Sequence, residues 1–213
     1  MRIAVLGANG NVGCRAAAEA LSRGYRVTAV VRDRKRVANV PEGAAIVVAD
    51  VSDADAIARL AQEHDLLIAA TRPAGGHEGD HAAMTDGILA GLKGSSARLI
   101  MVGGAACLAV PDSDGGLVLD DPRFVPPAIR PIAQASLDQY RRCQEADDVD
   151  WTYLCPPALL EPGERTGRYR LGAGELLLDS AGRSAISIED FVIALLDEAE
   201  EARHRRARFT VAY

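Results

Sequence analysis

Three glycines near the start of the chain have the spacing that phosphate binding requires. Gly7 and Gly10 lie between the apolar run 3–6 and a helix-like stretch at 12–23, and Gly13 lies at the start of that stretch. A strand, a glycine turn and a helix start form a nucleotide-binding unit, in which backbone N–H groups face a pyrophosphate. Gly7 allows a sharp exit from the strand, Gly10 lets phosphate oxygens approach the backbone, and Gly13 lets the helix pack close to the sheet. The alternative is a plain tight turn, because the chain contains 20 glycines.

Arg32 lies where the second apolar strand, expected at 25–31, should end. In dinucleotide-binding folds this position faces the adenosine ribose, where an acidic residue binds the two free hydroxyls and an arginine pairs with a 2′-phosphate. Arg32 and the basic residues at 34–36 therefore favour NADP(H) over NAD(H). Asp33 keeps the other choice open, because a one-residue shift of the strand end would present its carboxylate. The cluster could also be solvated charge that contacts nothing.

His77-Glu-Gly-Asp-His81 matches the zinc-binding pattern His-Glu-x-x-His. That pattern needs a buried helix, whereas this stretch begins beside glycines, contains Gly79 and has no evident third ligand. We therefore expect no metal site and interpret the stretch as the exposed first turn of a helix. His81 and Arg72 both lie near the carboxyl edge of the sheet and can still reach a ligand there.

The acid of typical short-chain reductases is missing. Those enzymes use a Tyr-x-x-x-Lys pair, but Tyr140 is followed four residues on by Gln144, and the only lysines are Lys35 and Lys93. A tyrosinate positioned by a lysine for proton transfer is therefore excluded. No catalytic residue is assigned from the sequence.

Strand-like and helix-like segments alternate along the chain. Strands are expected at 3–6, 25–31, 44–49, 64–69, 98–102, 150–155 and, as an edge strand, 208–211; helices are expected at 12–23, from 50–53 to 62, and at 84–93, 131–146 and 187–201. Loops are expected at 74–79 and 108–131. This order predicts an α/β fold, a doubly wound and mostly parallel Rossmann sheet with helices on both faces and a small C-terminal substrate-side region. We expect a single NAD(P)-binding domain over 1–213, with substrate-side segments at about 108–131 and 156–185.

Composition limits the partners and the location. The net charge of −6 gives no basic field for nucleic acid, and no apolar run approaches the roughly 18 residues that a membrane span needs. The first residues already read as a strand, so we expect no signal peptide and a cytoplasmic location. The cysteines, Cys14, Cys107, Cys143 and Cys155, form no Cys-x-x-Cys pair, and we expect reduced thiols.

Motifs spread over essentially the whole chain resemble one protein group. They are Gly-Ala-Asn-Gly-Asn-Val-Gly at 7–13, Val-Val-Arg at 30–32, Asp-Val at 50–51, Val-Gly-Gly-Ala at 102–105, Glu-Pro-Gly-Glu-Arg-Thr-Gly at 161–167 and Ile-Ser-Ile-Glu-Asp at 186–190. The chain resembles the NADH-flavin reductase group of atypical short-chain dehydrogenases, which bind NAD(P)H and are close to NmrA-like and biliverdin reductase B proteins. Members also lack the Tyr-x-x-x-Lys pair. Cys107 stands where many relatives have serine, which puts a hydroxyl role there in doubt.

The resemblance implies a set of cofactor-binding residues at the turns that follow the strands. They are Gly7, Asn9, Gly10, Asn11, Val12, Arg32, Asp50, Val51, Thr71 and Arg72, with Gly103 and Pro156 near the nicotinamide. Asp50 could accept a hydrogen bond from the adenine amino group, although a simple strand-end carboxylate is an equal alternative.

These observations predict an NAD(P)H-dependent reductase that passes hydride to a flavin or a similar conjugated acceptor, with flavin as substrate and not as bound cofactor. The segments 108–131 and 161–170 would wall the acceptor site, and Arg165, Arg168 and Arg170 could hold an anionic group or remain solvated. A non-catalytic, NmrA-like sensor of NADP(H) is the alternative, and a sugar-nucleotide epimerase or dehydratase is less favoured. We expect a small-molecule acceptor and a monomer or homodimer.

Overall fold

The computed structural model describes residues 1–73 and 76–213, so the first two residues of the loop expected at 74–79 lie outside the described residues. Strands and helices alternate through most of the chain. The strands are β1 (Arg2–Leu6), β2 (Arg26–Val31), β3 (Ala45–Val48), β4 (Leu66–Ala69), β5 (Arg98–Val102), β6 (Trp151–Cys155), β7 (Leu159–Glu161), β8 (Arg170–Gly172), β9 (Ala185–Ser187) and β10 (Ala207–Ala212). The helices are α1 (Asn11–Ser22), α2 (Ala54–Glu63), α3 (Asp80–Leu92), α4 (Arg130–Glu145) and α5 (Ile188–Glu201), with short 3-10 turns at Ala105–Cys107, Val118–Asp120 and Pro127–Ile129.

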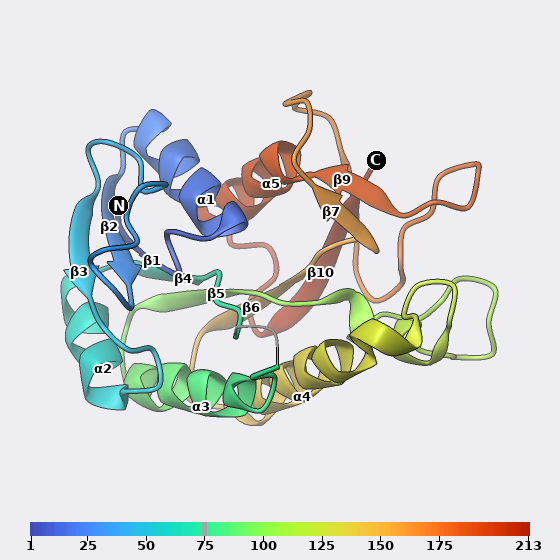
Figure 1. Cartoon of the computed structure of the whole chain (residues 1–213), viewed down its shortest axis with the longest axis horizontal. Coiled ribbons are helices and arrows are strands. Elements are labelled where there is room, and N and C mark those ends of the chain that lie inside the picture. The colour runs from blue at the N-terminus through green and yellow to red at the C-terminus, as the bar shows by residue number, and fades with distance from the viewer. Residues whose placement is uncertain (74–75) are drawn as a thin grey trace.

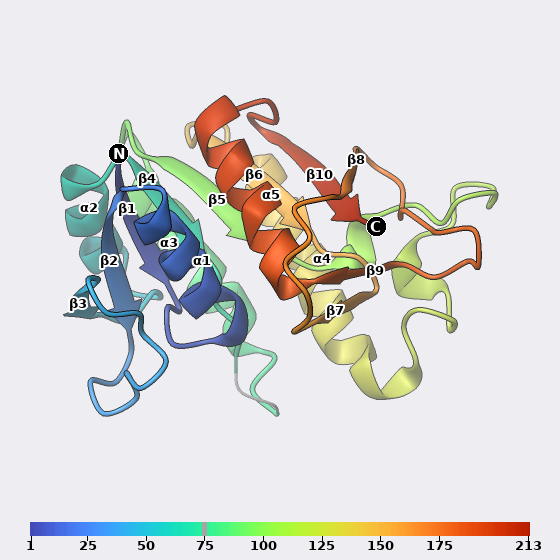
Figure 2. The ribbon, with the colours of Figure 1, turned by 90° about the horizontal axis from the view of Figure 1, so that it is seen from above.

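The main sheet has eight strands in the order β3-β2-β1-β4-β5-β6-β10-β8. All neighbouring strands are parallel except β10 and β8, which are antiparallel. Helices α1 and α5 cover one face, and α2, α3 and α4 cover the other (Figures 1 and 2). The predicted doubly wound Rossmann fold is confirmed. The strand order reverses between β1 and β4, which is where open α/β sheets bind ligands.

Strand β1 is buried on both faces of the sheet. Ile3 and Val5 pack in the cluster beneath α1 and α5, whereas Ala4 and Leu6 pack in the cluster beneath α2, α3 and α4. Because successive side chains of a strand point to opposite faces, one short apolar run contributes to two cores. This explains why the sequence shows a continuous apolar run here and not an alternating pattern.

The C-terminal strand was expected at the edge of the sheet, and this prediction is wrong. Strand β10 pairs with β6 on one side and with β8 on the other, so β8 forms that edge. Arg170 strengthens the pairing, because its Nε donates to the Tyr213 carbonyl at 3.0 Å and its Nη2 to the Leu178 carbonyl at 2.9 Å. From the sequence, the region around β8 is predicted only as a polar stretch.

A buried ion pair ties α5 to the sheet. The side chains of Arg98 and Glu198 are 7% and 3% exposed and form an ion pair, and Arg98 Nη2 also donates to Thr152 Oγ1 at 2.7 Å. His204 donates its backbone N–H to the Glu198 carboxylate at 3.0 Å. Burial alone would raise the pKa of Glu198, but the hydrogen bonds from His204 and Arg98 outweigh it and lower that pKa. The carboxylate therefore stays charged inside the protein.

Replacing one partner of this pair should be strongly destabilising. We expect Arg98→Met to lower the free energy of unfolding by about 3–5 kcal/mol, because it removes the buried cation and leaves only His204, among the described residues, to bond the Glu198 carboxylate. Urea unfolding measures this value. The double variant Arg98→Met/Glu198→Leu is the control and should recover most of the loss. A single variant as stable as the wild type would show that the pair does not hold α5 in place.

Candidate dinucleotide-binding site

A large pocket of about 1000 Å³ opens at the carboxyl ends of the parallel strands. It extends from the glycine turn after β1 to the irregular segment 108–131. All of the predicted cofactor residues except Asp50 line this one pocket: Gly7, Asn9, Gly10, Asn11, Val12, Arg32, Val51, Thr71, Arg72, Gly103 and Pro156. The turns that sequence reasoning selected one by one are therefore neighbours in space.

The glycine turn is closed to side chains at two of its three glycines. Gly7 has φ +77°, and a Cβ there would lie 2.6 Å from the Ala70 carbonyl oxygen at the end of β4. A Cβ on Gly13 would lie 2.2 Å from the Gly7 carbonyl oxygen. The close approach that Gly13 permits is thus between α1 and the turn itself, whereas the sequence suggested helix against sheet. A Cβ on Gly10 would only meet the Gly7 oxygen, at 3.3 Å, so the backbone is open on its pocket side.

The N-terminus of α1 can receive an anion. Its N-cap is Gly10, with no capping side chain among the described residues and no acidic residue in the first turn of the helix. The next helix differs, because the Asp53 carboxylate caps α2 through the N–H groups of Asp55 and Ala56. Backbone N–H groups at an uncapped helix start, with the positive end of the helix dipole, favour a bound phosphate. The residues present therefore fit a dinucleotide pyrophosphate.

Charged residues line the adenosine half of the pocket. Arg32 ends β2 there, and Asp33 and Arg36 also line the pocket. Asp50 lies outside the lining, because its carboxylate accepts hydrogen bonds from the Ser52 N–H at 2.9 Å and the Ser52 hydroxyl at 2.8 Å. Those bonds, with the nearby Arg32 charge, lower the pKa of Asp50. In the structure, the Asp50 carboxylate stabilises the turn after β3. That it accepts a hydrogen bond from the adenine amino group stays a prediction.

The other half of the pocket is mostly apolar. Its lining comes from segment 108–131, the start of α4 and the chain after β6: Val118, Phe124, Val125, Ile129, Ile132, Ala133, Pro156, Pro157, Ala158 and Leu160. Segment 108–131 therefore forms part of the pocket wall, and the prediction that it walls an acceptor site stays a prediction. Sequence reasoning missed the individual side chains, because a loop without periodicity gives no signal of which residues point inward.

The three arginines that could hold an anionic group or remain solvated, Arg165, Arg168 and Arg170, do not line the pocket. Arg165 forms an ion pair with Glu19 at 3.1 Å, Arg170 bonds main-chain carbonyls beside β8, and Arg168 is exposed. The stretch 161–170 is held elsewhere, because Asp190 accepts hydrogen bonds from the Thr166 hydroxyl at 2.5 Å and the Gly167 N–H at 2.8 Å. No residue of this stretch lines the large pocket, and its role at an acceptor stays a prediction.

Polar contacts connect α4 with the strands beneath it. Tyr153 is buried, and its hydroxyl donates to the Ser136 carbonyl at 2.8 Å and lies 3.1 Å from Gln139 Oε1. Burial raises the pKa of Tyr153 well above its ordinary value, so this phenol stays protonated. Ser136 and Gln139 line the pocket, which the sequence did not indicate. Cys107 lies buried with its Sγ 3.5 Å from Cys155 Sγ, and it does not line the pocket.

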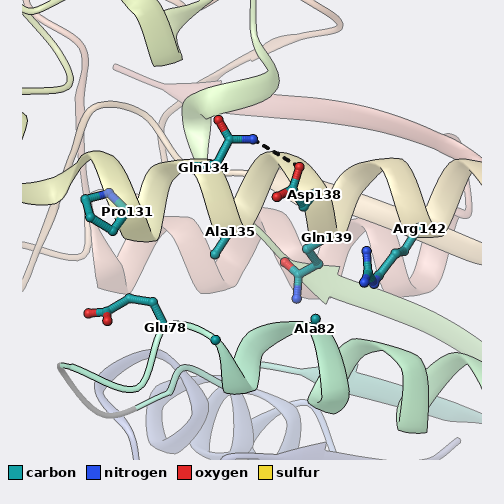
Figure 3. A pocket seen from close by; sticks show the side chains of 9 residues that line it. Glu78, Ala82, Pro131, Gln134, Ala135, Asp138, Gln139 and Arg142 are labelled. Carbon is teal, nitrogen blue, oxygen red and sulfur yellow. Dashed lines mark hydrogen bonds between the residues drawn. The ribbon is translucent and has the colours of Figure 1, made fainter.

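The His-Glu-x-x-His stretch does not form one helical face. Helix α3 begins at Asp80, so His77 precedes it and His81 lies in its first turn. The expectation of an exposed turn holds for His77 but not for His81, which is 7% exposed and lines the large pocket together with Arg72. A smaller cavity of about 270 Å³ lies beside it between α3 and α4, and Gln139 reaches into it from α4 (Figure 3).

Fold and site together define a dinucleotide-binding protein of the Rossmann class. A family model described as NAD(P)H-binding matches residues 7–199, and the chain belongs to this family. The Bacillus subtilis protein YwnB is 34% identical over 213 residues, which cover 99% of this chain and 98% of YwnB.

Solved structures agree with this assignment. A candidate exported protein from Burkholderia pseudomallei is 37% identical, with a TM-score of 0.88 and 100% of both chains covered. A candidate NADH-flavin reductase from Streptococcus pneumoniae is 28% identical, with a TM-score of 0.88 over 100% of this chain and 99% of that one. A candidate epimerase from Bacteroides thetaiotaomicron is 34% identical, with a TM-score of 0.87 over 100% and 96%. In the described part of this chain, no helix has the length and apolar character that a bilayer crossing needs.

The close packing of the glycine turn gives a direct test of the site. We expect Gly13→Ala to weaken NADPH binding at least tenfold and to lower stability by about 1–3 kcal/mol, because the new methyl group would displace the Gly7 carbonyl. Isothermal titration and thermal unfolding measure the two effects. Gly79→Ala is the matched control, since a Cβ there meets no described atom within 4 Å. Equal NADPH binding by the two variants would contradict this assignment.

Proposed function

We propose that this protein is an NADPH-dependent reductase whose acceptor is a flavin or a similarly conjugated ring compound. One observation carries the proposal: a single pocket of about 1000 Å³ combines a glycine turn that suits an anion, basic residues in its adenosine half and an apolar half. NADPH supplies a hydride when bound. The protein then has to align the nicotinamide with the acceptor, and the residues that line the pocket can do this.

The residues of this chain divide the task between them. The first turn of α1 binds the pyrophosphate, and Arg32 with Arg36 binds the 2′-phosphate. Gly103 and Pro156 flank the nicotinamide, and a side chain at Gly103 is ruled out by the Tyr153 ring, 2.0 Å from the position of its Cβ. The apolar residues Phe124, Val125 and Ile132 exclude water from the acceptor. A flavin takes its proton from water after hydride transfer, so this reaction needs no Tyr-x-x-x-Lys pair.

Two of the similar solved structures are described by different chemistries. The Streptococcus pneumoniae structure is that of a candidate NADH-flavin reductase and the Bacteroides thetaiotaomicron one that of a candidate epimerase. The absence of a Tyr-x-x-x-Lys pair favours the reductase over the epimerase. We further propose a small-molecule acceptor, no nucleic-acid or membrane partner, and a monomer or homodimer. We also propose a cytoplasmic location, since the four cysteines are free although Cys107 and Cys155 are adjacent.

A non-catalytic sensor of NADP(H) is the second candidate. The observation that favours it is on the pocket face of α4, where the Ser136 hydroxyl is already used as a donor to the Ala133 carbonyl at 2.8 Å. Absorbance at 340 nm with NADPH and FMN separates the two functions. NADPH oxidation faster than the background rate with FMN alone supports the reductase. Tight NADPH binding without such oxidation supports the sensor.

The choice of NADPH over NADH rests on Arg32. We expect Arg32→Asp to weaken NADPH binding about 10- to 100-fold and NADH binding far less, because it removes a charge-assisted bond to the 2′-phosphate. Arg34→Asp makes the same charge change in an exposed residue that does not line the pocket, and it should leave both affinities nearly unchanged. Equal losses for the two cofactors in Arg32→Asp would show that Arg32 does not contact a 2′-phosphate.

A further inference from the structure

The side chain of His81 is buried in the lining of the large pocket and forms no hydrogen bond with the residues that the structure describes. It lies in the first turn of α3, is 7% exposed and lines the large pocket. Its Nδ1 has no hydrogen-bond partner among the described residues, and no described residue bonds its Nε2. A buried polar atom without a partner costs about 1–3 kcal/mol, so native structures rarely keep one without a reason.

The polar residues around His81 already have protein partners. The Thr85 hydroxyl donates to the His81 carbonyl at 2.8 Å, and the Ser136 hydroxyl donates to the Ala133 carbonyl at 2.8 Å. Gln139 is 3.1 Å from the Tyr153 hydroxyl and 3.4 Å from that of Thr85. The other buried unpaired atoms in the described chain, on Arg98 and Trp151, are not in the pocket lining. Among the described buried side chains of the pocket lining, the imidazole of His81 is therefore the donor without an assigned acceptor, whereas its neighbour Arg72 is exposed.

The ring of His81 is neutral near pH 7 and presents an N–H to the pocket. Burial and, to a lesser extent, the positive charge of Arg72 lower the pKa of His81 below its ordinary value of 6.5. Nδ1 is enclosed without an acceptor, so the proton is better placed on Nε2, where a ligand can accept it. Met84, which follows His81 in α3 and also lines the pocket, adds an apolar neighbour beside the charge of Arg72.

We propose that His81 donates a hydrogen bond from Nε2 to a carbonyl oxygen of the acceptor, and that the acceptor is a neutral planar ring with a conjugated carbonyl. A neutral imidazole suits a carbonyl oxygen, which it can also polarise, better than it suits a phosphate. Ser136 Oγ lies 2.5 Å from the position of a Gly104 Cβ, which places this part of α4 beside the turn after β5. This inference rests on the proposed function and identifies the acceptor class at that site.

The test measures binding without turnover. Riboflavin carries conjugated carbonyls, whereas phenazine is a planar three-ring compound with none. Equilibrium dialysis of each against protein saturated with NADP⁺ gives the affinities, because the oxidised cofactor has no hydride to transfer. We expect His81→Phe to weaken riboflavin binding about three- to tenfold and to leave phenazine and NADP⁺ binding unchanged. His81→Gln, which keeps a donor, should recover part of the loss.

His77→Gln is the matched control, since His77 is nearby in sequence but exposed and outside the pocket lining. It should bind both probes like the wild type. Nitrogen-15 NMR of the wild type, with the His81 signals identified by their loss in His81→Gln, should show the Nε2–H tautomer and a shift of Nε2 when riboflavin is added. This readout decides the question even if His81→Phe does not fold.

Two results would overturn the assignment of His81 alone: riboflavin affinity unchanged in His81→Phe, or equal losses of riboflavin and phenazine. An Nε2 signal that riboflavin does not move would do the same. Wild-type protein that binds NADP⁺ but no riboflavin would instead overturn the flavin-type acceptor, and the proposed reduction of flavin would fail with it.

Discussion

The backbone contact between the turn after β1 and the end of β4 is the constraint on which the site depends. Gly7 takes a positive φ so that the chain can leave β1 sharply, and its α-carbon approaches the Ala70 carbonyl too closely for any side chain. Gly13 then closes α1 onto the same turn. Because β1 and β4 flank the reversal of strand order, this contact fixes where the helix N-terminus points and where the two halves of the pocket meet.

Features that depend on neighbours in the sequence could be predicted well. The alternation of apolar runs and helical stretches gave the doubly wound sheet, and Gly24, with φ +80°, follows α1 in the left-handed conformation that a helix end favours. Glycine turns and strand ends selected the cofactor residues, because in a parallel sheet all such turns meet at one edge. Of these, Asp50 alone lies outside the pocket lining, since a local bond to Ser52 turns its side chain away.

Features that depend on distant contacts could not be predicted. Whether 208–211 is an edge strand depends on whether β8 pairs with it, and β8 is a short polar segment without strand periodicity. Arg165 could have faced the pocket, but its ion pair with Glu19 on α1 keeps it outside the pocket lining and largely exposed to solvent. His81 looks exposed beside its glycines, yet α3 begins early enough to bury it against the pocket. In each case the deciding partner is far away in the sequence.

Asp190 shows what such distant partners mean for variation in sequence. One buried carboxylate receives the Thr166 hydroxyl, the Gly167 N–H and the Tyr213 hydroxyl, while the backbone N–H of Asp190 is capped by Ser187. Residues that share one hydrogen-bond network do not contribute additively. Tyr213, Thr166 and Asp190 are therefore constrained as a group, so that a substitution tolerated at one position depends on what occupies the other two. Across relatives these positions should covary, although they are widely separated in the sequence.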